Sequence, residues 1–294
     1  MIAVALAAVS ALSYGASDFS GALATKDNDA TVVTLAMQVV SLLALGAIVV
    51  AFPAGQLRTV DLAWGAVGGL AAAFGLVTFY RALALGPMSV AAALTALWST
   101  AVPVVAGLLL GDRPGLVTLG GIAIAVPAAA LVSLEGGRGE PTQQATGART
   151  AMPHVQARTR RLAVMAGVGF GLFFVALSRA SPDAGLLPLL GARAASITGL
   201  LIVILWGRSL ATIGRRWWPA IGLAGLLDCA ANSLYLWALR YGSLTWVAAI
   251  SSLYPVSTVL LARLVLGERI AVVQRIGLAA ASLAMILFGV GATG

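Results

Sequence analysis

The chain has 294 residues, of which 60% are hydrophobic and only 10% are charged. Soluble domains contain about half apolar and about a quarter charged residues, so this composition excludes a water-soluble globular protein. A membrane-spanning helix needs about 20 residues, and ten helices of about 22 residues would leave only short connections. The sequence therefore predicts an all-α polytopic membrane protein with ten transmembrane helices.

The basic excess is 18 Lys and Arg against 10 Asp and Glu, a formal net charge of +8. The basic residues fall mainly in connectors between apolar stretches, where anionic lipid head groups are the expected partner and nucleic acid is not. The single cysteine, Cys229, lies in an apolar run and is interpreted as a small buried hydrophobe.

Apolar stretches broken by polar or turn-forming clusters give the predicted helices. In chain order these are 2–24, 31–52, 62–85, 89–110, 116–134, 162–180, 186–206, 219–241, 243–266 and 271–291. The runs are continuous and do not alternate, which favours helices over a barrel. The first run has no basic start and is long for a signal peptide, so it is expected to be a retained helix.

The one long connector, 135–161, is rich in Gly, Pro, Thr, Gln and Arg and carries the only histidine, His154. Its composition predicts a flexible linker. The chain is thereby divided into a first five-helix unit, 1–134, and a second one, 162–294.

The two units are related by an internal repeat at an offset of 156 residues. Residues 82–113 lie on 238–269 without a gap, with 11 identities in 32 positions. The turn residues agree best, since Gly86 falls on Gly242 and the Gly-acid-Arg sequence at 111–113 falls on that at 267–269. The same offset places Tyr14-Gly15 on Phe170-Gly171 and Gly121 on Gly277. A unit with an odd number of spans enters the membrane from opposite sides in its two copies, which predicts inverted repeats and alternating access to a midplane site.

Three segments carry a resemblance to a known family: Ser252-Leu253-Tyr254-Pro255-Val256 followed by Leu266-Gly267-Glu268-Arg269, the weaker copy Leu110-Gly111-Asp112-Arg113, and Tyr14-Gly15-Ala16-Ser17-Asp18-Phe19. The chain resembles the EamA-type transporters of the drug/metabolite transporter superfamily over nearly its whole length. The resemblance implies a ten-helix transporter of small organic molecules, often an exporter, and no single substrate. Asp112 stands where the family usually has Glu. The Gly-acid-Arg turns are interpreted as helix ends, with direct substrate contact as the alternative.

Five ionisable residues fall inside apolar helices, where charge is costly and marks functional candidates. They are Asp18, Arg81, Arg193, Asp228 and Arg263. Their repeat mates are uncharged: Phe174, Trp237, Met37, Ala72 and Gly107. The charges therefore break the symmetry of the repeat, which a pure packing device has less reason to do.

Asp18 and Arg81 are matched in depth, roughly 9 Å and 6 Å from the membrane face where their helices end. We expect them to pair or to share a cavity, because an unpaired charge at that depth is expensive. The alternative is that Arg81 reaches the interface alone.

Asp228 lies near the midplane, about 13 Å from its entry face, with Asn232 one turn further on the same helical face. We expect Asp228 to bind substrate or a proton, and its alternative role is a structural hydrogen bond. Arg193 is a candidate partner of Asp228, although an axial offset of roughly 8 Å requires the full reach of an arginine.

Aromatic residues in transporters can stack on flat substrates or hold cations over their faces. The candidates for lining a cavity are Tyr14, Tyr80, Trp98, Tyr235, Trp237 and Tyr254, of which Trp98 and Tyr254 are repeat mates. Packing and interfacial anchoring are the alternative roles.

The predicted substrate-binding residues are Tyr14, Asp18, Arg81, Trp98, Arg193, Asp228, Asn232 and Tyr254. The predicted function is secondary active export of small organic metabolites, amino acid-like or drug-like compounds, with protons as a candidate coupling ion. We expect a multi-pass monomer of the plasma membrane or bacterial inner membrane, surrounded by lipid, with no catalytic residues, cofactor or metal.

Two other classes of function remain as alternatives. An intramembrane transferase would need a His, a Cys or clustered carboxylates, yet His154 lies in the linker and Cys229 is alone. A non-transporting membrane scaffold would not need charges at mid-membrane depth. A nucleotide-driven pump is disfavoured because the sequence has no G-x-x-x-x-G-K-[ST] loop.

The orientation in the membrane stays open. Lys and Arg are concentrated in the connectors on the linker's side, so the positive-inside rule places the linker in the cytoplasm and both termini outside. The resemblance implies cytoplasmic termini instead.

Overall fold

The computed structural model describes residues 1–25, 27–52, 55–56, 58–85, 88–133, 153–207, 212–266 and 271–291. Within these ranges the chain forms α-helices and two short 3-10 helices, and no strand. The helices of the first half are α1 (Ile2–Thr25), α2 (Ala30–Ala51), α3 (Thr59–Leu85), α4 (Met88–Leu109) and α5 (Leu116–Ser133). Those of the second half are α7 (Pro153–Ser178), α8 (Leu187–Gly207), α9 (Trp218–Tyr241), α10 (Leu244–Ser251), α11 (Pro255–Leu266) and α12 (Val272–Gly291). The short helices η1 (Pro182–Ala184) and η2 (Arg215–Trp217) precede α8 and α9.

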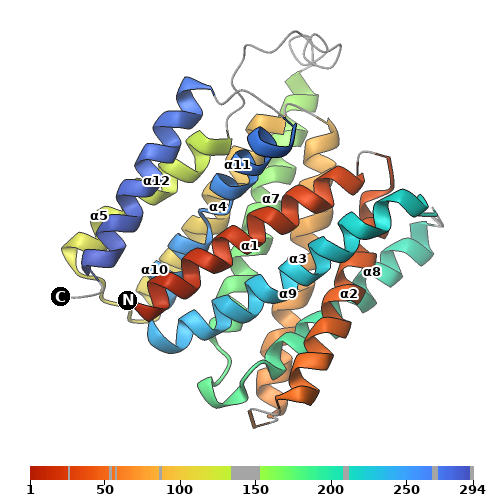
Figure 1. Ribbon diagram of the computed structural model, residues 1–294, viewed down its shortest axis with the longest axis horizontal. Helices are drawn as coiled ribbons and strands as arrows, with labels where there is room; N and C mark the ends of the chain where they lie inside the picture. Colours follow the sequence, from red (N-terminus) through yellow and green to blue (C-terminus); the bar gives the residue numbers. More distant parts are fainter. Residues whose placement is uncertain are drawn as a thin grey trace.

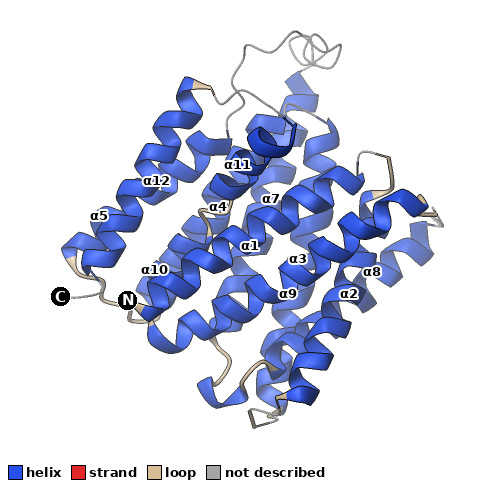
Figure 2. Ribbon diagram, in the orientation of Figure 1, coloured by secondary structure: helices blue, strands red, loops and turns tan. Residues whose placement is uncertain are grey.

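Membrane-spanning segments account for nearly all of this structure. Among the described residues, eight segments are long and apolar enough to cross a membrane, with α10 and α11 counted as one, and two shorter apolar helices lie at 94–109 and 116–132. Figure 2 shows the helices joined by short loops. This confirms the expectation of an all-α polytopic membrane protein with about ten spans.

Two predicted segments differ from the structure. The span expected over 243–266 is broken by a turn at 252–254, because Pro255 has no N–H to continue α10 and instead begins α11. Residues 153–161, expected in the linker, form the first turns of α7, which also begins on a proline. The rest of the predicted linker, and with it Glu135, lies outside the described residues.

The helices pack in pairs that follow the repeat. α1 packs along α9, and its repeat mate α7 packs along α3, the mate of α9. The remaining large contacts include two that join an element to its own mate, α2 with α8 and α5 with α12. Figure 1 places these two pairs at opposite ends of the molecule, with α1, α3, α7 and α9 between them. This pairing is what an approximate two-fold axis between the halves produces.

Glycines at repeat-related positions make equivalent close approaches. A Cβ at Gly69 would clash with the α8 backbone, and one at its mate Gly225 would meet the backbone carbonyl of Met37 in α2. The pair Gly121 and Gly277 behaves alike, since the first faces Phe288 of α12 and the second faces the α5 backbone. Small residues let membrane helices approach closely, so the repeated glycines hold the two halves together in the same way on both sides of the axis.

Serine hydroxyls add polar contacts between α1 and α9. Ser10 Oγ donates to the carbonyl oxygen of Ala231 at 2.8 Å, and Ser17 Oγ donates to that of Ala224 at 2.8 Å. Such bonds between membrane helices each contribute about 0.6 kcal/mol on average. They fix the position of α1 against α9, and both helices carry residues of the site described below.

The Gly-Asp-Arg turn after α4 has a structural contact. Gly111 takes a positive φ of 101°, which ends the helix. The Asp112 carboxylate accepts hydrogen bonds from Thr245 N at 2.9 Å and from Thr245 Oγ1 at 2.6 Å, at the start of α10. Asp112 therefore caps a helix of the other half rather than the next helix in the chain. Its repeat mate Glu268 lies outside the described residues.

Candidate functional site

A cavity of about 80 Å³ lies between the two halves of the chain. At about 10 to 15 Å³ for each water centre, it holds on the order of six waters. Its walls come from α1, α2 and α3 of the first half, from α7, α8 and α9 of the second, and from the turn between α10 and α11. The lining residues are Tyr14, Ser17, Asp18, Met37, Gln38, Ala72, Leu76, Phe170, Phe173, Phe174, Arg193, Asp228, Asn232 and Tyr254.

The lining reproduces the 156-residue offset. Twelve of its residues form six repeat-related pairs: 14 with 170, 17 with 173, 18 with 174, 37 with 193, 72 with 228 and 76 with 232. Repeat mates face one another across the cavity only if it lies close to the axis that relates the halves. The chemistry of the pairs is unequal, because Asp18, Arg193 and Asp228 have the uncharged mates Phe174, Met37 and Ala72.

An ion pair joins α8 to α9 at one wall. Arg193 Nη2 lies 2.6 Å from Asp228 Oδ2, and Arg193 Nη1 also donates to Gln38 Oε1 of α2. The arginine is only 3% exposed, whereas the side chain of Asp228 is 20% exposed. This confirms the expected Arg193 to Asp228 contact and shows that two charges share one buried, neutral pair.

Further hydrogen bonds occupy two more acceptor positions of Asp228. Ser41 Oγ donates to Asp228 Oδ2 at 3.0 Å, and Asn232 Nδ2 donates to Asp228 Oδ1 at 3.0 Å. Asn232 Oδ1 in turn accepts from Tyr14 Oη at 2.8 Å. The chain of bonds thus runs from α1 through α9 to α2 and α8, and it fixes the orientation of every polar group in it.

Asp18 has a different environment. Its carboxylate lines the cavity, yet among the described residues no side chain or backbone group is bonded to it and no basic group pairs with it. Asp18 is therefore the carboxylate of the cavity whose acceptor positions the described residues leave open.

Aromatic rings form much of the remaining wall. Tyr14 and Phe174 meet edge to face with ring centroids 5.9 Å apart, and Phe173 lies 5.7 Å from Phe174. Phe170 and Tyr254 complete the aromatic wall. Rings in these arrangements offer both apolar surface and the negative faces that attract cations.

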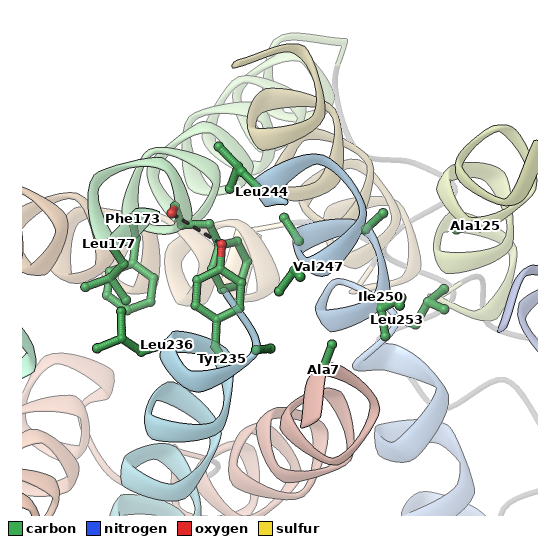
Figure 3. Packing of buried hydrophobic residues seen from close by; sticks show 14 of the residues in the cluster. Ala7, Ala125, Phe173, Leu177, Tyr235, Leu236, Leu244, Val247, Ile250 and Leu253 are labelled. Carbon is green, nitrogen blue, oxygen red and sulfur yellow. Dashed lines mark hydrogen bonds between the residues drawn. The ribbon is translucent and has the colours of Figure 1, made fainter. Parts of the chain in front are cut away.

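A buried apolar layer next to the cavity contains Phe173, Phe174, Tyr235, Leu236 and Val247. The ring centroids of Phe174 and Tyr235 lie 4.6 Å apart, and Tyr235 Oη donates to the carbonyl oxygen of Phe174 at 3.3 Å. Figure 3 shows this packing between α7, α9 and α10. Phe173 and Phe174 belong both to this layer and to the lining of the cavity.

The structure brings six of the eight predicted binding residues to this cavity. Arg81 and Trp98 are not among the lining residues, and both are exposed. The expected pair of Asp18 with Arg81 does not form within the described residues. The physical reason is that equal depth does not make helices neighbours: α1 packs mainly along α9, while α3 packs along α7 and α8.

The other sequence candidates lie elsewhere. Tyr235 is buried in the apolar layer, Trp237 is exposed, and Arg263 is exposed in the last turn of α11. The side chains of Tyr80 and His154 lie outside the described residues.

Sequence reasoning missed Gln38 and Ser41, the α2 residues that bond to Arg193 and Asp228. A signal for them exists, because two polar side chains three residues apart occupy one face of an otherwise apolar helix. The phenylalanines of α7 carry no such signal, since they are indistinguishable from packing residues in an apolar run.

Residues 161–290 match the model of the EamA-like transporter family. The second half of the chain is EamA-like. The match to a transporter family, together with the apolar helices long enough to cross a membrane, lies in a multi-pass membrane protein. The EamA-like segment contributes α7, α8, α9 and the turn before α11 to the cavity.

The complete chain shares its fold with a solved crystal structure of a protein. The two agree with a TM-score of 0.77 over 98% of this chain and 96% of the other, at 16% sequence identity. At this identity the likeness concerns the fold. No curated protein matches the sequence.

Proposed function

We propose that the protein is a secondary active transporter that exports small organic metabolites, amino acid-like or drug-like compounds. The observation that carries the proposal is the cavity between the two halves, with an ion pair and an additional carboxylate at its surface. Charged groups are expensive inside a membrane and are kept there where they serve a ligand or ion pathway.

Alternating access is the mechanism that this architecture supports. The two proposed units, 1–134 and 162–294, contact one another through repeat-related pairs of helices. An exchange of conformation between the units would open the apolar layer beside α10 and close the opposite side of the cavity. A solute held between the units would then meet first one side of the membrane and then the other.

Protons are the proposed coupling ion, because the cavity offers two carboxylates that can bind them, Asp18 and Asp228. Net proton binding at Asp228 would compete with its pairing to Arg193. The affinity for solute would then depend on the proton gradient, as coupled transport requires.

Flux through the purified protein in proteoliposomes tests the function. A radiolabelled panel of amino acids, amines and small carboxylates should give accumulation of at least one class, larger with a pH gradient than without it. Asp228→Asn should remove the effect of the gradient, while Asp183→Asn, an exposed carboxylate before α8, should leave it unchanged. Chemical conversion of a solute would indicate a transferase, and binding without flux would indicate a scaffold.

A further inference from the structure

We infer that the cavity takes a small aromatic amine in its protonated form, with the ammonium group at the Asp18 carboxylate and the ring against the aromatic wall. This inference rests on the proposed function, since it names the class of solute for the same cavity. It follows from the charges, from the occupied hydrogen-bonding groups and from the rings of the lining.

The charges of the lining leave one negative charge over. Arg193 and Asp228 neutralise each other at 2.6 Å, and Asp18 is the remaining carboxyl group of the lining, which becomes negative when it loses its proton. An anionic solute would meet this excess negative charge and find its natural partner, Arg193, already engaged. A cation instead restores neutrality to a cavity that lies at membrane depth.

The hydrogen bonds of the lining also favour the Asp18 carboxylate as the site of the ammonium group. Ser41, Asn232 and Arg193 occupy Asp228, whereas the described residues leave Asp18 open. An ammonium group supplies up to three donors to a carboxylate that has acceptor positions free. The amine is therefore placed at Asp18 and not at Asp228.

A zwitterionic amino acid fits this lining less well than the amine alone. Its carboxylate would need a donor group, and the described cation of the cavity, Arg193, already bonds to Asp228 and Gln38. The donor that Arg193 has left without a partner, Nε, is fully buried, so Arg193 would have to move within its buried network to reach that carboxylate, which is costly. The lining thus selects against a carboxylate on the solute.

The aromatic wall indicates the apolar part of the solute. Five aromatic residues line the cavity: Tyr14, Phe170, Phe173, Phe174 and Tyr254. Aromatic faces bind a flat ring by stacking and add attraction for a neighbouring cation. A ring joined to an ammonium group by a short chain uses both features at once.

Three compounds with the same ring and different charge provide the test: phenethylamine, phenylalanine and 3-phenylpropionate. Their binding to the full chain in lipid nanodiscs is measured by titration calorimetry. Phenethylamine should bind about tenfold or more tightly than either of the other two, because only it brings a net positive charge to the cavity. Equal binding of the three, or a preference for phenylalanine or the anion, would overturn the inference without need of any variant.

Binding to variants then tests whether the Asp18 carboxylate holds the ammonium group. Asp18→Asn should weaken phenethylamine binding by about tenfold or more, and Asp18→Glu should retain most of it. The control Asp183→Asn removes an exposed carboxylate and should leave binding unchanged. Phe170→Leu should weaken binding by about two- to fivefold through loss of one aromatic face. Full binding to a folded Asp18→Asn protein would contradict the assignment of Asp18.

Flux measurements separate this inference from the proposed function. Phenethylamine binding that depends on Asp18, without flux, would support the ligand class and refute transport. Flux of other solutes without phenethylamine binding would support transport and refute the ligand class.

Discussion

The ion pair of Arg193 and Asp228 can be dissected with residues that the chain itself supplies. Their repeat mates are Met37 and Ala72, so Arg193→Met and Asp228→Ala place in the second half the side chains that the first half already carries. Removing one partner of a buried pair costs about 3–5 kcal/mol, because the other charge is left without compensation.

The two single substitutions should differ in magnitude. After Arg193→Met, Asp228 keeps its bonds from Ser41 and Asn232, and its side chain is 20% exposed. The free energy of unfolding should therefore fall by about 3 kcal/mol, the lower end of the range. After Asp228→Ala, the guanidinium of Arg193 stays almost fully buried with Gln38 as its bonded partner. The free energy of unfolding should therefore fall by about 5 kcal/mol, the upper end of the range. The double variant leaves no charge behind and should lose less than the more damaging single variant.

The assay is equilibrium unfolding in mixed micelles, in which SDS is titrated against a mild detergent and the free energy of unfolding is taken for all four proteins. The prediction is a strong departure from additivity, with the double variant at least as stable as Asp228→Ala. Additive losses would mean that the two groups do not stabilise each other, and the description of the site as a neutral buried pair would be wrong.

Three further substitutions test the packing and the hydrogen bonds around the site, each by the same unfolding measurement. Gly69→Ala should lose about 1–3 kcal/mol because its methyl group would clash with the α8 backbone, whereas Gly46→Ala, which meets nothing within 4 Å, should lose nothing; equal losses would contradict the proposed close approach. Asp112→Ala should lose about 1–2 kcal/mol, since α10 loses its cap, and an unchanged stability would show that the cap is dispensable. Tyr14→Phe should lose about 1 kcal/mol by removing the bond to Asn232, and a gain in stability would indicate that this hydroxyl is not bonded as described.

Much of the architecture could be predicted because a membrane imposes one length and one composition on every span. The apolar runs gave helix ends that mostly agree with the structure to within a few residues. The offset of 156 residues, found from turns such as Gly111 and from Gly121, also relates positions that line the cavity. A repeat visible in sequence fixes which positions are equivalent in space, so it carries long-range information that propensity does not.

The neighbours of each helix could not be predicted in the same way. Depth along a helix follows from counting residues, and it left Arg193 as a candidate partner of Asp228 across an axial offset of roughly 8 Å, which the arginine spans in the structure. The direction that a side chain faces and the helix it meets depend on the packing of all spans together. Arg81 has the depth of Asp18 but lies on a helix that packs elsewhere, so the predicted pair does not form. The same limit concealed Gln38 and Ser41, whose role depends on α2 lying beside α8 and α9.

The break before Pro255 illustrates a different limit. The proline was visible, yet a proline inside a membrane helix can also be accommodated without a break, as Pro103 and Pro127 are in α4 and α5. Whether the helix continues depends on what satisfies the freed backbone groups. At this turn Leu253 N donates to the carbonyl oxygen of Ile250 and Val256 N donates to that of Leu253, so bonds between residues three apart replace the helical pattern.

Access to the cavity from each side of the membrane tests the central claim most directly. Cys229→Ala gives a chain without cysteine, into which Leu76→Cys places a single thiol at the cavity. In oriented vesicles, a membrane-impermeant thiol reagent applied to either side should label this position, whereas Val203→Cys on the exposed, apolar outer surface of α8 should remain unlabelled. Labelling of Leu76→Cys from one side alone under all solute and pH conditions would contradict a cavity that opens alternately to the two sides.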